Sequence, residues 1–221
     1  MTTEEVVQQL TAPDIEEQLN ILRDMPHLSA VPEVYRILVA NLASADSRVV
    51  FLSLDLLIKR YRSQLQEAAD TFIPQFIHLL STNDGPVVDR CIWALSVTGE
   101  KALHALITCI ITATDERRKE ACIWALGRNA HLRLQPKVVV DTLRTQLQEA
   151  NPRIRYAAVN ALMDMSPLRP FERLTSTEYD FEPLYGELQV VAQTLAETQP
   201  DYSEWMEQYL ELLRDRKTYD G

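Results

Sequence analysis

Residues 84–95, DGPVVDRCIWAL, and residues 115–126, DERRKEACIWAL, are two copies of one twelve-residue frame that decides the fold. Two further copies are DSRVVFLSLDLL at 46–57 and NPRIRYAAVNAL at 151–162, and a degenerate fifth copy is expected from Thr11 to Leu22. The four clear copies follow one another at offsets of 38, 31 and 36 residues. Periods of this length are typical of helical repeat arrays, in which each repeat is one supersecondary unit.

Each clear copy has the residue pattern of an amphipathic helix. The first residue is Asp or Asn, whose side chain caps free backbone N–H groups of a first helical turn. The eighth residue is small, the eleventh is apolar and the twelfth is always leucine: Ser53, Cys91, Cys122 and Ala158; Leu56, Ala94, Ala125 and Ala161; Leu57, Leu95, Leu126 and Leu162. Positions four, eight, eleven and twelve share one helical face, which we expect to be buried.

A second apolar-periodic segment precedes each clear copy, at residues 31–44, 70–81, 101–113 and 136–150. Each repeat is therefore predicted to be two helices joined by a short turn. One such pair cannot bury its apolar face alone, whereas stacked pairs build a continuous core. The scarcity of glycine, five residues in all, also favours helices over a β-sandwich or a glycine-looped nucleotide fold.

The frame Asp-x-x-Val-Arg-x-x-Ala-x-x-Ala-Leu resembles the second helix of a HEAT repeat, particularly the short bacterial type also found in phycobilin lyase subunits. The copy at 151–162 matches best, with Ile154, Arg155, Ala158, Ala161 and Leu162 in place. The other copies replace the family's arginine with Val50, Val88 and Lys119. The prediction is an all-α protein, an α-solenoid of about five HEAT-like helix pairs over residues 1–166.

Residues 167–221 lose the repeat and are predicted to be an irregular crossover and acidic capping helices of the same compact domain. Helices are expected at 187–197 and 201–216. In the second, Asp201 and Glu204 fit a capping box, and Trp205, Tyr209 and Leu212–Leu213 form an apolar stripe. Such a terminal unit would cover the open end of the core. Five of the eight tyrosines lie here, so an acidic aromatic arm that binds a partner is the alternative.

The third, sixth, tenth and thirteenth residues of each copy are expected opposite the core face, because successive helical residues turn by about 100°. The HEAT resemblance implies that this stripe faces a concave groove. We predict a partner-binding surface there, made by Phe51, Asp55, Asp89, Trp93, Arg117, Glu120, Trp124, Tyr156 and Asn160. Trp93 and Trp124 should stand side by side, and tryptophan is a typical interface anchor. The indoles could instead pack on neighbouring helices, and the sequence leaves both interpretations open.

The net charge of −10 is unevenly spread, since residues 176–221 hold eleven acidic and three basic residues. An acidic chain without a basic stripe argues against binding to nucleic acid. It fits a protein partner with a basic or mixed-charge surface. We expect no signal peptide, and no apolar run approaches the length of a membrane span. The predicted localisation is therefore cytoplasmic, without a membrane partner.

No residue pattern indicates catalysis, and neither a metal nor a cofactor is predicted. The four histidines are scattered without metal-ligand spacing, and the Walker, GxSxG and GxGxxG motifs are absent. Three cysteines without a CxxC motif argue against a disulfide framework and a zinc site. Cys91, Cys109 and Cys122 are interpreted as small apolar packing residues.

Three functions are compatible with this sequence. The leading hypothesis is a non-enzymatic protein–protein interaction module, such as an adaptor, an assembly factor or an inhibitor. The resemblance implies an alternative, a phycobilin-lyase-like subunit or tetrapyrrole chaperone, with tryptophans stacked on the ring and propionates paired with Arg117, Arg128 or Arg153. A HEAT-like DNA glycosylase, with a carboxylate beside a tryptophan, is the third, and the missing basic stripe weighs against it.

Overall fold

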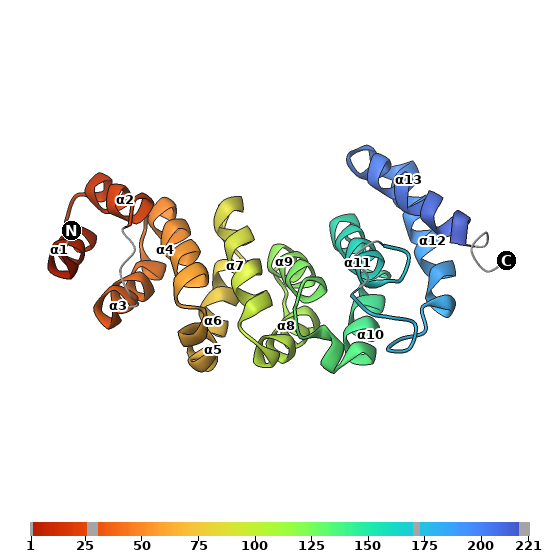
Figure 1. Ribbon diagram of the computed structural model, residues 1–221. Helices are drawn as coiled ribbons and strands as arrows, with labels where there is room; N and C mark the ends of the chain where they lie inside the picture. Colours follow the sequence, from red (N-terminus) through yellow and green to blue (C-terminus); the bar gives the residue numbers. More distant parts are fainter. Residues whose placement is uncertain (1, 26–30, 170–172, 217–221) are drawn as a thin grey trace. The chain divides into compact units, whose positions relative to one another are not determined.

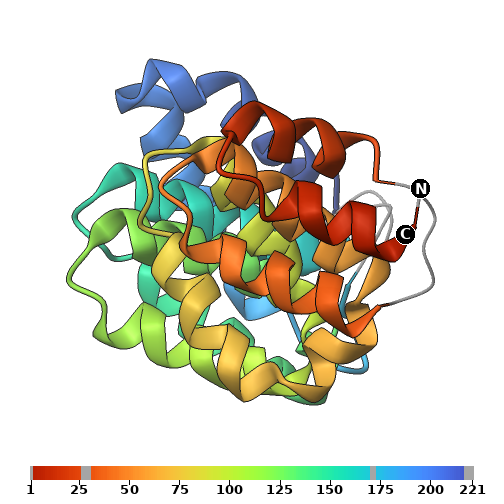
Figure 2. The same cartoon turned by 90° about the vertical axis from the view of Figure 1, so that its left-hand side faces the viewer.

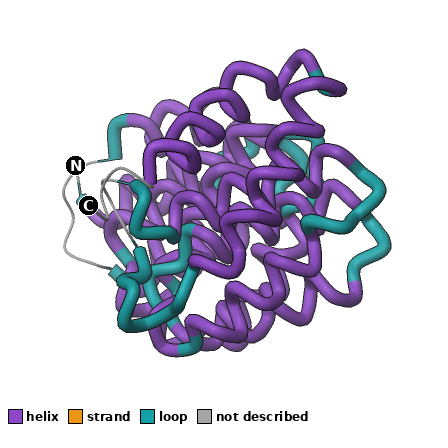
Figure 3. Tube along the Cα trace, turned by 90° about the vertical axis from the view of Figure 1, so that its right-hand side faces the viewer, coloured by secondary structure: helices purple, strands orange, loops and turns teal. Residues whose placement is uncertain are grey.

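The computed structural model describes residues 2–25, 31–169 and 173–216, and the chain divides into two compact units, Met1–Ala102 and Leu103–Gly221. The described residues form helices and loops and contain no β-strand (Figure 3). Helices stack in pairs within each unit, which is the arrangement of an α-solenoid. The predicted all-α fold class is therefore confirmed. The expected domain boundary at 166/167 lies inside the second unit.

The described residues of the first unit form three helix pairs. Figures 1 and 2 show these helices from two sides. Its helices are α1 (Thr3–Leu10), α2 (Ile15–Arg23), α3 (Pro32–Ala40), α4 (Ser47–Arg60), the short α5 (Arg62–Glu67), α6 (Ala69–Leu79) and α7 (Gly85–Val97). The pairs are α1 with α2, α3 with α4, and α6 with α7, and the second helices α2, α4 and α7 pack on one another in order. A 3-10 turn, Asn41–Ala43, joins α3 to the loop before α4.

The second unit contains the rest of the repeat and the C-terminal helices. Its helices are α8 (Glu100–Thr112, which starts in the first unit), α9 (Glu116–Gly127), α10 (Pro136–Gln146), α11 (Pro152–Met165), α12 (Glu182–Thr198) and α13 (Pro200–Asp215), with a 3-10 turn at Leu132–Leu134. Helix α11 packs against α9, α10 and α12, and α12 packs along α13. The last pair thus covers the end of the repeat, as predicted.

The repeat frame positions the second helices as the sequence predicts. Asp46, Asp84, Asp115 and Asn151 are the N-caps of α4, α7, α9 and α11, and each side chain accepts a hydrogen bond from a backbone N–H of the first turn. The residues at positions eight, eleven and twelve are buried in all four helices. The frame therefore fixes both where each helix begins and which face enters the core.

We expect Asp84→Ala to lower the free energy of unfolding by about 1 kcal/mol, because Oδ1 of Asp84 accepts from the backbone N–H of Val87 at 3.1 Å. Asp89→Ala, an exposed change on the same helix, is the matched control and should stay within about 0.5 kcal/mol. Urea unfolding followed by circular dichroism measures both. Equal losses from the two variants would show that the cap contributes nothing.

A glycine brings α9 and α11 unusually close together. A Cβ atom added at Gly127 would lie 2.7 Å from Cβ of Ala161 and 3.2 Å from its Cα. Both residues are buried. Only a residue without a side chain permits this approach.

The structure corrects three sequence expectations about helix ends. The degenerate first copy does not begin at Thr11, because Thr11 ends α1 and Asp14 caps the shorter α2. Helix α12 begins at Glu182, five residues before the predicted start. Asp201 and Glu204 do not form a capping box, because α13 begins at Pro200 with Gln199 as its N-cap and no side-chain bond there. The short helix α5 had no predicted counterpart.

Candidate partner-binding surface

The first unit brings together part of the predicted stripe around Arg90. On α7, the guanidinium of Arg90 lies over the rings of Phe51 and Trp93, at 5.0 and 5.3 Å from their centroids. Its Nε is 3.1 Å from Oδ1 of Asp55, and the other carboxylate oxygen of Asp55 is 2.6 Å from Nζ of Lys59. We call these five residues the Arg90 cluster. It links α4 and α7 through charge and aromatic contacts.

Trp93 is the most exposed aromatic residue of the Arg90 cluster. Its side chain is 37% exposed, which is high for a tryptophan, whereas Asp55 and Phe51 are half-buried. Asp89, one turn earlier on α7, is also exposed. The guanidinium of Arg90 contacts the indole of Trp93, while part of the indole surface stays open to solvent. Such a ring can serve as an anchor for a partner.

Arg90 is the residue that the sequence reasoning missed. It occupies the seventh position of its frame, between the buried face and the predicted outer stripe. A signal was present, because Arg90 precedes Trp93 by three residues, and side chains three apart are neighbours on a helix. Cation–π contact with two rings follows from that spacing together with the packing of α7 on α4.

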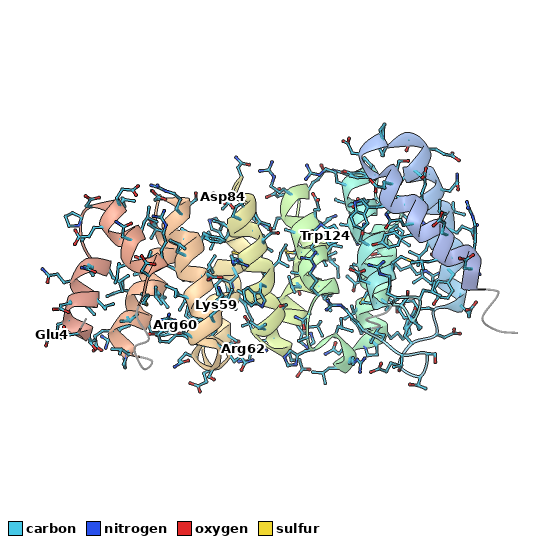
Figure 4. All side chains as sticks on the ribbon, turned by 45° about the horizontal axis from the view of Figure 1, so that its top comes forward. Glu4, Lys59, Arg60, Arg62, Asp84 and Trp124 are labelled. Atoms are coloured by element: carbon cyan, nitrogen blue, oxygen red, sulfur yellow. The ribbon has the colours of Figure 1, made fainter. Side chains whose placement is uncertain are left out.

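In the second unit, the ring of Trp124 packs against neighbouring side chains rather than being open to solvent. Its ring meets the ring of Tyr156 edge to face at 6.1 Å between centroids, and the guanidinium of Arg128 lies 5.4 Å from its centroid. Figure 4 marks Trp124 among the side chains of α9. The ring is half-buried. Of the two interpretations left open by the sequence, packing against the neighbouring helix describes Trp124.

Charged residues of the stripe meet at the N-terminal ends of α9 and α11. Nε of Arg153 is 3.1 Å from Oε2 of Glu120, and Arg117 is exposed beside them. These side chains line a shallow hollow of about 560 Å³, together with Glu116 and Asn151. Its lining carries both signs of charge, so it matches a mixed-charge surface better than a purely basic or acidic one.

Helix α13 covers the C-terminal end of the stripe. The ring of Tyr202 stacks on Tyr156 with 4.2 Å between centroids, and the hydroxyl of Tyr209 donates to Oδ1 of Asn160 at 2.6 Å. Asn160 also donates to the backbone carbonyl of Tyr156 at 2.8 Å, and it is only 6% exposed. The expectation that Asn160 lines an open surface is therefore wrong. Burial raises the pKa of the Tyr209 hydroxyl.

The thirteenth position of the frame also corrects the helical-wheel expectation. Its residues are buried in all four helices: Ile58, Ser96, Gly127 and Met163. Neighbouring helices bury more of each helix surface than the face formed by positions four, eight, eleven and twelve. The outer stripe is therefore reduced to positions three, six and ten, without the buried Asn160. The expected adjacency of Trp93 and Trp124 stays a prediction, because the two residues belong to different units.

A cavity outside the predicted stripe lies within the second unit. Its volume is about 670 Å³, and its lining includes Arg169, Tyr179, Phe181, Tyr185 and Arg216. Burial raises the pKa of Tyr185 to about 12, and the guanidinium of Arg216 lies 4.8 Å from the centroid of its ring. The repeat gave no indication of this cavity, because its walls come from the crossover and the last two helices.

Neither a metal cluster nor a membrane-spanning helix is found in the described part of the chain. No group of three His, Cys, Asp or Glu side chains there could hold a metal ion. None of the helices described is long and apolar enough to cross a bilayer.

Stacked helix pairs place this chain in the class of helical repeat proteins with an α-solenoid fold. No family model and no curated protein matches it. Among solved structures, the MAST/Orbit N-terminal domain aligns over 97% of this chain and 98% of its own, with 14% sequence identity and a TM-score of 0.60. An engineered protein solved as a structural genomics target aligns over the same shares, with 19% identity and a TM-score of 0.48. The MAST/Orbit likeness supports the helical repeat fold.

Proposed function

We propose that this protein is a non-enzymatic protein–protein interaction module, an adaptor, assembly factor or inhibitor, whose binding surface includes the Arg90 cluster. The observation that supports this most strongly is Trp93, a large aromatic ring that remains 37% exposed while Arg90 holds it in place. Tryptophan and arginine contribute most of the binding energy in many interfaces. A ring held before binding loses little conformational entropy when a partner covers it.

The partner is proposed to be a protein with a basic or mixed-charge surface around an apolar pocket. The pocket would receive the indole of Trp93, and a basic side chain would approach Asp89 one turn away. The chain's net charge of −10 favours such a partner over an acidic one. In the second unit, Arg117 and Glu120 offer further mixed-charge contacts.

The repeats are proposed to be HEAT-like and the protein cytoplasmic. The Asp or Asn caps, the small eighth residues and the invariant leucines support the HEAT resemblance. A HEAT-like module also explains why the second helices carry the aromatic and charged stripe, since second helices line the concave face in that family.

The tetrapyrrole alternative has weaker support from the contacts. Of the three arginines considered for propionate pairing, Arg128 lies over Trp124 and Arg153 pairs with Glu120, whereas Arg117 is exposed beside them. The half-buried ring of Trp124 offers little face for stacking. Titration with biliverdin or haem tests this alternative, because pigment binding shifts the absorption spectrum, and the interaction-module proposal expects no shift at micromolar pigment. The glycosylase alternative lacks a basic groove, as the charge distribution indicates.

We expect Trp93→Ala to weaken partner binding at least about tenfold, since an anchor residue costs more than about 1.4 kcal/mol when truncated. The partner is first captured from native lysate on immobilised wild-type protein. Its affinity for each purified variant is then measured by calorimetry. The thermal midpoint should change by only a few degrees, because the ring is partly exposed.

Trp205→Ala is the matched control for Trp93→Ala. Trp205 is 49% exposed on α13 and lies outside the Arg90 cluster, so its loss should leave partner affinity unchanged. The proposal fails if both variants bind as tightly as the wild type, or if Trp205→Ala alone weakens binding. Arg90→Gln provides a second check, because it removes the charge that holds the ring and should also weaken binding.

A further inference from the structure

Two of the three cysteines lie against each other in the second unit. The thiol of Cys122, on α9, donates to Sγ of Cys109, on α8, with 3.0 Å between the sulfur atoms. Both are free cysteines and both are buried. Among the residues that the structure describes, Cys91, the third cysteine, faces no other cysteine. A disulfide bond needs the sulfur atoms at about 2.05 Å, so the pair must close by about 1 Å.

The repeat frame does not require this pair of thiols. Position eight of the frame needs only a small residue, as Ser53 on α4 and Ala158 on α11 show. Cys91 fills the same position on α7 without facing another cysteine. Cys122 fills position eight on α9, and the residue that faces it on α8 is another cysteine, Cys109. Packing alone therefore accounts for Cys91 but not for the juxtaposition of Cys109 and Cys122.

The thiols of Cys109 and Cys122 differ in their exposure to solvent and in their pKa. Cys109 is 9% exposed, whereas Cys91 and Cys122 are fully buried. The hydrogen bond from Cys122 lowers the pKa of the Cys109 thiol, and the positive charge of Arg118 acts in the same direction. Burial raises the pKa of Cys91 to about 12. Because the thiolate is the reactive form, Cys109 is the cysteine best placed to meet an oxidant.

We propose that Cys109 and Cys122 are a redox-active pair that forms a reversible disulfide between α8 and α9 when the protein meets a peroxide. The thiolate of Cys109 attacks one peroxide oxygen, the O–O bond breaks, and Cys109 becomes a sulfenic acid while the other oxygen leaves as water. Cys122 then loses its proton, its sulfur attacks Sγ of Cys109, the S–O bond breaks, and hydroxide leaves to become a second water. Two thiols are oxidised by two electrons in all, and one peroxide is reduced.

The second step is helped by the first. Hydrogen bonding to Cys109, burial and the negative charge of the Cys109 thiolate all raise the pKa of Cys122. Once Cys109 is a neutral sulfenic acid, that charge is gone and Cys122 ionises more readily. A dithiol reductant reverses the bond by thiol–disulfide exchange. The disulfide would tie together the two helices of one repeat.

The test uses the full chain and exploits its trypsin sites. Cleavage places Cys91, Cys109 and Cys122 in three separate peptides, residues 91–101, 102–117 and 120–128. The folded protein is treated with hydrogen peroxide, the peroxide is removed, and the protein is unfolded in denaturant so that N-ethylmaleimide can reach and block every free thiol. The protein is then digested with trypsin, and the peptides are examined by mass spectrometry. We expect peptide 102–117 joined to peptide 120–128, with peptide 91–101 carrying the maleimide. Dithiothreitol should remove the link, and the linked protein should melt at a higher temperature.

Two variants and a control in denaturant test whether the disulfide is specific to Cys109 and Cys122. Cys122→Ala, the residue found at this position on α11, should keep the fold but stop at a sulfenic acid on Cys109, which dimedone traps. Cys91→Ala should form the link as the wild type does. In denaturant the preference for the pair should disappear. The proposal is overturned if excess peroxide leaves all three thiols free in the folded protein, or if Cys91 is oxidised or linked as readily as the other two.

Discussion

Replacing Gly127 with alanine is expected to lower the free energy of unfolding by about 1–3 kcal/mol, the usual cost of overpacking a filled core. The added methyl group would meet Cβ of Ala161 at 2.7 Å, and both helices are buried at this point. Since the nearest atoms belong to the side-chain stem and backbone of Ala161, no flexible side chain can move aside. Helices α9 and α11 must separate instead.

Thermal unfolding measures the Gly127→Ala effect, at about 2–4 °C per kcal/mol for a chain of this size. Gly186→Ala is the matched control, because Gly186 lies inside α12 with nothing within 4 Å of an added Cβ. That change should stabilise the protein by about 0.5–1 kcal/mol, since alanine favours the helix more than glycine does. Ala161→Gly should restore part of the loss in the double variant. If Gly127→Ala raises the free energy of unfolding, as Gly186→Ala should, then α9 and α11 do not approach each other as closely as described.

The second large effect is expected at the contact between α13 and α11. Tyr209→Phe removes the hydroxyl that donates to Asn160 at 2.6 Å and leaves a buried amide oxygen without that donor. A loss of about 1–3 kcal/mol should follow, the cost of an unsatisfied buried polar group. Tyr202→Phe keeps its ring stacked on Tyr156 and serves as the control, with a change within about 0.5 kcal/mol. Urea denaturation of the wild type, Tyr209→Phe and Tyr202→Phe measures these changes in the free energy of unfolding.

Alkaline unfolding gives an independent signature of Tyr209. Burial raises the pKa of this hydroxyl in the folded protein above the unfolded value of about 10. Between these two values the unfolded chain has lost the proton and the folded protein keeps it, so unfolding is favoured as pH rises. The stabilisation is therefore complete below about pH 10 and is lost as pH rises through the folded pKa. Tyr209→Phe should make stability fall less steeply above pH 10.

Most of the repeat could be predicted from the sequence, because it rests on interactions within one helix. An Asp or Asn cap acts on the turn that follows it, and apolar spacing selects one face of one helix. Both features were correct in α4, α7, α9 and α11. Errors gathered where the local pattern was ambiguous. Thr11 resembles a cap but ends a helix, and Asp201 lies in the first turn of α13 rather than before it.

Which residues are open on the candidate surface depends on contacts between helices more than the repeat frame does. The sequence placed Trp93 and Trp124 in equivalent positions, yet Trp124 is half-buried with its ring edge to face with Tyr156, whereas Trp93 is 37% exposed. No residue pattern in the frame distinguishes these two outcomes. Within the second unit, α11 places Tyr156 beside the indole of Trp124. Within the first unit, α4 places Phe51 against Arg90, which in turn lies over the indole of Trp93.

The sequence by itself determined a helical repeat with capped second helices, small residues at their eighth positions and a leucine-rich core. These properties follow from side chains and backbone within a few residues of one another. Only the tertiary structure decided that Asn160 is buried under Tyr209, 49 residues away, that Gly127 must be small, and that Cys109 meets Cys122. The physical reason is that helical spacing sets the direction of a side chain, whereas its surroundings depend on segments whose separation in the chain carries no periodic signal.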